Sequence, residues 1–98
     1  MNEIYEQACF QIISFAGTSK SCFLEAIEMA KDGLDPNELI LEGNDAFQQA
    51  SIAHHKALQL DAKNELKMGL LLIHAETILS SAETIRDLSQ TIIELIKK

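Results

Sequence analysis

The sequence KDGLDPNE at residues 31–38 separates two long helix-forming stretches and decides how this chain folds. Gly33 is suited to ending a helix, because glycine readily adopts the left-handed conformation found just beyond helix ends. Asp35 can cap the next helix, Pro36 fits its first turn, and Glu38 can complete a capping box. The motif therefore predicts that one helix ends just before Gly33 and that another begins at Pro36.

The stretch before this turn predicts a helix from about Asn2 to Lys31. Its apolar residues recur at spacings of three and four, which places them on one helix face: Ile4, Ala8, Ile12, Phe15, Phe23, Ile27 and Ala30. Glycine in a helix interior costs roughly 1 kcal/mol relative to alanine. The segment at 17–19, which begins with Gly17, is therefore expected either to kink this helix or to break it into two shorter ones.

The stretch after the turn predicts a second helix from Pro36 to about Ala62. Many residues of its expected buried face are alanines, which let neighbouring helices approach closely: Leu39, Ile40, Ala46, Phe47, Ala50, Ala53, Ala57 and Leu58. Residues 61–64 are polar and read as a short connection in which Asn64 can cap the next helix. A third helix is then expected from Glu65 to about Ile96.

The third helix has the strongest heptad pattern of the chain. Residues seven apart form two columns offset by three, as in a coiled-coil seam: Leu71, Ile78, Ile85 and Ile92, and His74, Ser81, Leu88 and Leu95. The seam holds more aliphatic residues than one three-helix subunit needs, so we expect association between copies. The sequence thus predicts an all-α fold, a three-helix antiparallel bundle in a single domain spanning residues 1–98.

Composition excludes several classes of function. The chain has 8 Lys and Arg against 15 Asp and Glu, a formal charge of −7, which would repel nucleic acid and anionic lipid. It shows neither a secretory signal nor an apolar run of about 18 residues, so we expect a cytoplasmic protein without membrane insertion. Cys9 and Cys22 lack CxxC spacing and read as reduced thiols rather than as a zinc site or disulfide.

Three histidines are the candidate chemical groups. On residue pattern alone, His74 is either a hydrogen-bonded structural histidine or a functional group that titrates near neutral pH. His54 and His55 are adjacent on one helix, so their side chains point roughly 100° apart and cannot both bind one ion. We expect these two to serve surface or interhelical packing, with the alternative that His54 approaches His74 across the bundle. The acidic residues of the first two helices read as a solvated face: Glu25, Glu28, Asp32, Glu38 and Glu42.

Three motifs carry a resemblance to a known family. The segment CFQIISFAG at 9–17, followed by Ser21 and LEA at 24–26, resembles a family opening of G-F-E-I-V-(A/S)-(F/Y)-A-G and S-x-(F/L)-L-E-A. EGN at 42–44 and IIEL at 92–95 resemble later stretches of the same family. On these motifs, which span most of the chain, the sequence is similar to the lactose/cellobiose-type enzyme IIA components of the bacterial phosphoenolpyruvate-dependent sugar phosphotransferase system.

The resemblance implies a role for His74. The family pattern M-H-(G/A)-Q-D-H-L-M falls on residues 73–80, and its first histidine, the phosphate acceptor, falls on His74. The chain is thus expected to be a phosphotransferase that takes phosphate from the phosphocarrier HPr on His74 and passes it to a cysteine of a cognate IIB component. The resemblance also implies a homotrimer. Hydroxyls of Thr77, Ser80 or Ser81, or groups of another subunit, are expected to contact the phosphoryl oxygens.

Two residues depart from the family pattern. The family's aspartate at the trimer axis, which helps to bind a metal ion, is Thr77 here, and its second histidine is Ile78. Three neutral hydroxyls need no cation to offset their charge, so we expect no metal and no other cofactor. These departures leave open an alternative function, a non-catalytic helical oligomeric interaction or regulatory module derived from the same family.

Overall fold

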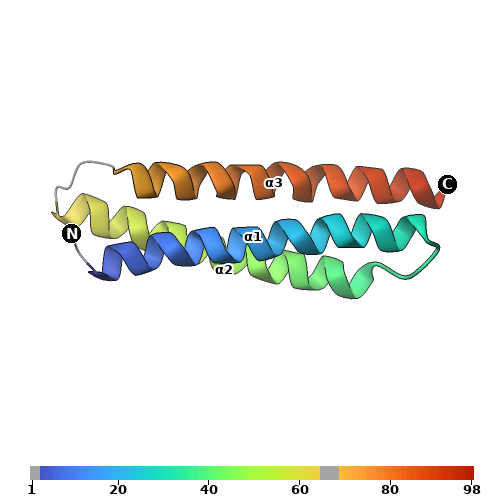
Figure 1. Cartoon of the computed structure of the whole chain (residues 1–98), viewed down its shortest axis with the longest axis horizontal. Coiled ribbons are helices and arrows are strands. Elements are labelled where there is room, and N and C mark those ends of the chain that lie inside the picture. Colours follow the sequence, from blue (N-terminus) through green and yellow to red (C-terminus); the bar gives the residue numbers. More distant parts are fainter. Residues whose placement is uncertain (1–2, 65–68) are drawn as a thin grey trace.

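Three long helices make up the computed structural model, which describes residues 3–64 and 69–98. They are α1 (Glu3–Lys31), α2 (Asn37–Asn64) and α3 (Leu70–Lys97), and the described residues form no strand. The helices run up, down and up along a rod of 51 × 17 × 15 Å (Figure 1). The all-α class and the three-helix antiparallel bundle predicted from sequence are confirmed.

The turn between α1 and α2 has the structure that its sequence predicts. Gly33 has a φ of 76°, and the Leu34 N–H donates to the Met29 carbonyl at 2.9 Å, which together form a Schellman helix end. The Asp35 carboxylate then accepts a hydrogen bond from the Asn37 N–H at 3.0 Å and so caps α2. The predicted end of the first helix at Lys31 is confirmed, and α2 begins at Asn37, one residue after the predicted start at Pro36.

Two other boundaries differ from the prediction. Helix α1 is continuous through Gly17, because the packing on both sides of this residue outweighs the small propensity cost of one glycine. Helix α2 continues to Asn64, beyond the predicted end at Ala62. The predicted start of the third helix at Glu65 lies outside the described residues, and α3 begins at Leu70 after an extended Gly69 (φ −89°, ψ 167°).

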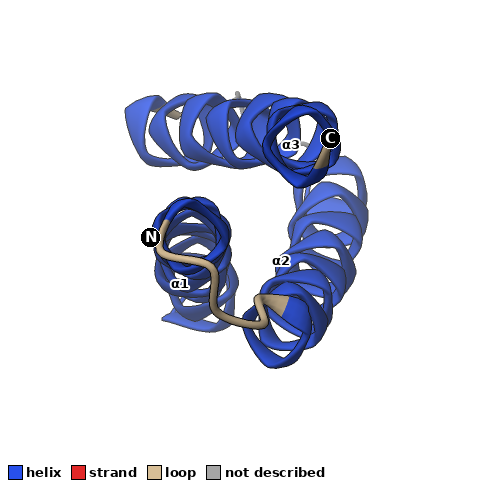
Figure 2. Ribbon diagram, turned by 90° about the vertical axis from the view of Figure 1, so that its right-hand side faces the viewer, coloured by secondary structure: helices blue, strands red, loops and turns tan. Residues whose placement is uncertain are grey.

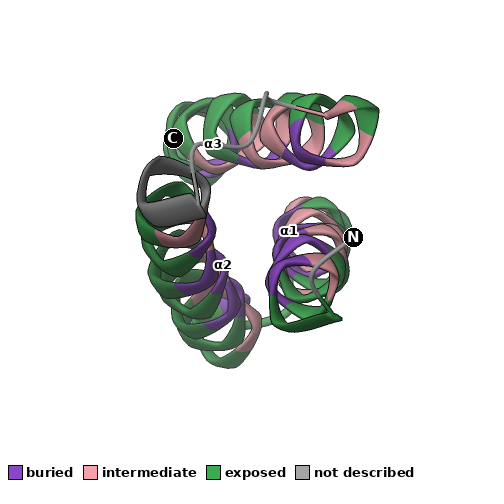
Figure 3. Ribbon diagram, turned by 90° about the vertical axis from the view of Figure 1, so that its left-hand side faces the viewer, coloured by how far each residue is buried: buried purple, intermediate pink, exposed green. Residues whose placement is uncertain are grey.

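Helix α1 is the centre of the bundle. It packs along both α2 and α3, whereas these two contact each other much less. Figure 2 shows the three helices viewed along the bundle. Buried residues line the inward faces (Figure 3). Much of this core is alanine: Ala16, Ala50 and Ala82, one from each helix, come together with no exposed surface. Ile4 and Leu58, which were expected to be buried, are exposed.

The EGN motif of α2 lies at a close contact between α1 and α2. A Cβ atom added to Gly43 would lie 2.9 Å from the buried Phe23 ring, so only glycine fits there without a shift. The buried Ser19 hydroxyl donates to the Gly43 carbonyl at 2.8 Å. This motif therefore has a structural role.

Among the described helices, none is both long and apolar enough to cross a bilayer.

Candidate functional site

His74 lies exposed in the second turn of α3. The residues around it hold the backbone, because Leu72 and Ala75 are fully buried and share a core cluster with Ile12 of α1 and Ala53 of α2. These anchors on both sides orient the intervening His74 side chain away from the core. The imidazole is thus presented to solvent from a fixed turn.

The imidazole of His74 makes no hydrogen bond or ion pair with another described residue of the chain. A structural histidine is usually buried against polar partners, because an unpaired buried polar group costs free energy. An exposed imidazole on a rigid backbone is instead open to an incoming reactant. The geometry therefore favours the functional interpretation of His74 over the structural one.

The hydroxyls near His74 are only partly available. Thr77 and Ser81 follow His74 at helical spacings that place all three along one side of α3. The Thr77 hydroxyl donates to the Ile73 carbonyl one turn back, at 3.0 Å. Ser80 lies further round the helix. To donate a hydrogen bond to a phosphoryl oxygen at His74, the Thr77 hydroxyl would have to turn away from the Ile73 carbonyl. The half-buried Ser81 carries the other hydroxyl on this side of α3.

A second histidine is tied to the same turn from the opposite side. The His54 Nε2 of α2 lies 2.8 Å from the Glu76 Oε2 of α3, and both side chains are about two-thirds buried. The interhelical placement expected for His54 is confirmed, and its partner is Glu76 rather than His74. His55 is exposed on α2. The pairing of His54 with Glu76 was missed by the sequence analysis, which treated the two residues separately.

The predicted seam of α3 lies beside the core and not within it. The buried positions of α3 are Leu72, Ala75, Ala82, Ser89 and Ile93. The seam columns are displaced from them round the helix, and Leu88 and Leu95 are 55% and 62% exposed. His74 belongs to this uncovered apolar side. In a single chain, the candidate site therefore continues directly into an unpartnered apolar surface.

The described residues do not suggest a metal centre. No group of three or more His, Cys, Asp or Glu side chains lies close enough within residues 3–64 and 69–98 to hold an ion. Cys9 and Cys22 are buried and form no disulfide. Burial raises the pKa of Cys22, and the nearby negative charges of Glu42 and Glu25 raise it further. A thiol of this kind is held protonated and is a poor nucleophile.

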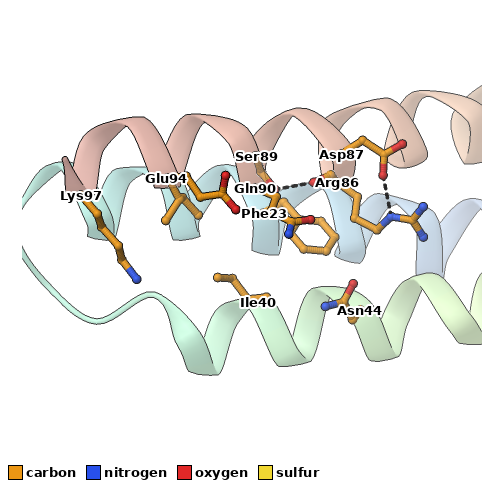
Figure 4. A pocket seen from close by; sticks show the side chains of 10 residues that line it. Phe23, Ile40, Asn44, Arg86, Asp87, Ser89, Gln90, Glu94 and Lys97 are labelled. Carbon is orange, nitrogen blue, oxygen red and sulfur yellow. Dashed lines mark hydrogen bonds and ion pairs between the residues drawn. The ribbon is translucent and has the colours of Figure 1, made fainter.

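A cavity of about 550 Å³ lies between α2 and α3 at the other end of the bundle (Figure 4). Phe23 and Ile40 contribute apolar surface, while Arg86 and Lys97 are opposed by equal numbers of carboxylates. The Arg86 guanidinium is also held by Asp87 and lies 4.3 Å from the centre of the Phe47 ring. The cavity is about 18 Å along α3 from His74, so it is not part of the His74 site.

Comparison with known proteins shows one consistent family. Residues 7–97 match the sequence profile of the family described as "PTS system, Lactose/Cellobiose specific IIA subunit". The lichenan-specific phosphotransferase enzyme IIA component of Bacillus subtilis is 41% identical, over 100% of this chain and 92% of that protein. The lactose-specific EIIA component of Staphylococcus epidermidis is 35% identical, over 91% and 88%.

The solved structures agree with the sequence comparisons. The crystal structure of the cellobiose-specific enzyme IIA from Bacillus anthracis superimposes with a TM-score of 0.88 and 31% sequence identity. The match covers 99% of this chain and 92% of that one. The similarity therefore extends over the whole bundle, including the turn that carries His74.

Proposed function

The chain belongs to the lactose/cellobiose-specific IIA family of the sugar phosphotransferase system, and we propose that His74 carries phosphate from HPr to a cognate IIB component. Membership of the family supports a role in phosphotransfer during sugar uptake. The observation that carries the assignment to His74 is its placement, exposed on a turn whose backbone is fixed by buried neighbours. His54 is engaged with Glu76, and His55, although exposed, does not fall on the acceptor position of the family pattern.

The proposed chemistry is two successive displacements at phosphorus. A neutral imidazole nitrogen of His74 attacks the phosphoryl group on the histidine of HPr, forming one N–P bond while the bond to HPr breaks. A cysteine thiolate of the IIB component then attacks the same phosphorus, forming an S–P bond and releasing the His74 nitrogen. Both steps depend mainly on positioning and on donors directed at the phosphoryl oxygens. The phosphoryl transfer is thus reversible and needs no cofactor.

A second copy of the chain is proposed to complete the site. The imidazole has no orienting partner among the described residues, and the apolar seam beside it is uncovered, with Leu88 and Leu95 more than half exposed. A homotrimer that covers this seam would bury the aliphatic residues and bring groups of a neighbouring subunit towards His74. Thr77 supplies a neutral hydroxyl in this region, so we propose that the assembly forms without a metal ion. The assembly is proposed to act in the cytoplasm.

The sugar is proposed to be selected by a partner and not by this chain. The similar proteins are named for lichenan, lactose and cellobiose, although their IIA components share one fold and family. The His74 site contacts a phosphoryl group in both proposed steps and never the sugar itself. Specificity for one carbohydrate would therefore lie in the membrane permease.

The relay can be tested with purified components. The protein is incubated with phosphoenolpyruvate, enzyme I and HPr, analysed by intact-mass spectrometry without acid, and then mixed with a IIB component. We expect one phosphoryl group per chain, which is lost when IIB is added. A wild-type protein that forms its oligomer but accepts no phosphate from several HPr proteins would support the non-catalytic interaction module instead.

A further inference from the structure

An ion pair joins His54 of α2 to Glu76 of α3, which lies two residues after the proposed acceptor His74. Its atoms are 2.8 Å apart, and the side chains are 27% and 33% exposed. The other two ion pairs of the described residues, Lys31 with Glu28 and Arg86 with Asp87, each join neighbours within one helix. Within the described part of the chain, His54 and Glu76 thus form the ion pair that links different helices.

Beyond the buried Leu72 and Ala75, the start of α3 has few restraints of its own. Its N-cap is Gly69, which makes no side-chain capping hydrogen bond, and its first turn contains no acidic residue to offset the helix dipole. The first helical backbone bond joins the Ile73 N–H to the Gly69 carbonyl at 3.2 Å. A helix end without a cap frays easily. The turn that carries His74 therefore depends on tertiary contacts for its order.

Contacts between α2 and α3 are few compared with those that α1 makes to either helix. The next specific side-chain contact between these helices is the Arg86 guanidinium over the Phe47 ring, 4.3 Å from its centre. Arg86 lies about 15 Å further along α3 than Glu76. Buried alanines of α2, Ala53 and Ala57, pack near Ala75 but give the helix no directional bond. Among the residues whose side chains the structure describes, the His54–Glu76 pair is thus the directional link at this end of the α2–α3 interface.

We propose that His54 and Glu76 are positioning residues that fix the His74 turn of α3 for phosphoryl transfer, an inference that rests on the proposed function. Neither residue contacts the reacting atoms. Glu76 follows His74 by two residues, so the two side chains project to opposite sides of α3 and the pair acts through the shared backbone. Because phosphoryl transfer depends on alignment, a small displacement of this turn lowers the rate steeply.

The pairing also holds the Glu76 carboxylate away from the proposed acceptor. This carboxylate is engaged with His54 across the α2–α3 interface, whereas a released carboxylate would place its negative charge on the turn that receives a phosphoryl dianion. A neutral pair of side chains that form a hydrogen bond between α2 and α3 would also hold this turn, and it would add no charge. The double substitution H54Q/E76Q should therefore preserve function, whereas loss of one partner should not.

The transfer assay compares H54A, E76A and H54Q/E76Q with wild type, with exposed neighbours H55A and E83A as controls. We expect each single variant to load from phospho-HPr about tenfold more slowly at saturating donor, with an unchanged half-saturating concentration. The double variant and both controls should keep wild-type rates. Equal slowing of the single and double variants, or unchanged rates in all of them, would overturn the inference.

Hydrogen exchange provides a second measurement that needs no phosphoryl donor. In H54A, the amides of residues 73–77 should exchange about tenfold faster than in wild type, while those of α1 stay unchanged. The H54Q/E76Q protein should recover protection. Unchanged exchange in H54A would refute the positioning role even if the wild type carries phosphate. Faster local exchange in a protein that accepts no phosphate would instead refute only the proposed function.

Discussion

Gly43 and Gly17 differ in the space that the surrounding structure leaves for a side chain. At Gly43 an added Cβ would meet three Phe23 ring atoms at 2.9, 3.0 and 3.1 Å, whereas at Gly17 nothing lies within 4 Å. Both residues belong to motifs that mark the family resemblance. The sequence indicated a soft point at Gly17, but only the packing of α1 on α2 shows that Gly43 is the position where glycine is required.

Gly43→Ala and Gly17→Ala are therefore expected to change stability in opposite directions. The first forces a buried aromatic ring to move, and such overpacking costs roughly 1–3 kcal/mol, more than the helix propensity gained. The second gains up to about 1 kcal/mol because it removes a glycine from a helix interior without a clash. Thermal melting of both variants measures the effect. Equal changes in the melting temperatures of both variants, with the same sign, would show that contact with the Phe23 ring does not make glycine necessary at position 43.

The Cys22 thiol should make stability depend on alkaline pH. In the folded protein, burial and the charges of Glu42 and Glu25 raise the pKa of this thiol. In the unfolded chain its pKa is about 8.5. Above that pH the unfolded state loses a proton that the folded state retains, so the free energy of unfolding falls as pH rises. Urea denaturation at several alkaline pH values tests this, with Cys22→Ala expected to flatten the slope and Glu42→Gln to flatten it partly. Parallel slopes in all three proteins would contradict this assignment.

At the scale of the helices, local chemistry explains which boundaries were predictable. The end of α1 and the start of α2 depend on Gly33 and Asp35, whose side-chain and backbone preferences act within a few residues. The start of α3 follows Gly69, which lacks a capping side chain and left no pattern to detect. Continuity at Gly17 likewise depends on neighbouring helices, which a sequence pattern does not contain.

The apolar seam of α3 also shows a limit of what the sequence pattern can predict. Its heptad columns predicted an apolar stripe correctly, but one stripe does not reveal which part faces the core and which part faces another molecule. In the structure, Leu71 and Ile78 of this stripe pack against the core, while Leu88 and Leu95 stay exposed. The position of His74 was identified through the family pattern, whereas its link to α2 through Glu76 needed the three-dimensional arrangement.

Substitution in this seam tests the proposed assembly. Ile85 is half-buried on the seam side, so Ile85→Lys would place three charges inside a trimer interface and should yield monomers. Glu94→Lys, on the other side of α3, is the matched control and should leave the oligomer intact. Light scattering at micromolar concentration measures the mass. A monomeric wild type, or an Ile85→Lys protein that stays trimeric, would contradict the seam as the interface.

At the scale of the whole molecule, assembly is expected to be independent of metal. Thr77 provides a hydroxyl where the family pattern has a carboxylate, so no cluster of negative charge needs a cation. Treatment with EDTA should change neither the melting temperature nor the mass of the oligomer. A large fall in melting temperature that a divalent cation reverses would show that other residues bind an ion.

The charge of the whole chain limits the surfaces with which it can associate. With a formal charge of −7, the protein carries a negative field that favours association with an electropositive surface and opposes binding to nucleic acid. The bundle presents His74 on one side of α3 and ties the same turn to α2 on the other. The account therefore depends most on a single group, the His74 imidazole.

Localising the phosphate is the most direct test of the central claim. The protein is loaded from phospho-HPr, digested at neutral to alkaline pH, where phosphohistidine survives, and mapped by tandem mass spectrometry. We predict one acid-labile phosphoryl group on His74, absent from His74→Ala and still present, though formed more slowly, when both His54 and His55 are replaced by alanine. Phosphate on His54 or His55, or full labelling of His74→Ala, would contradict the account.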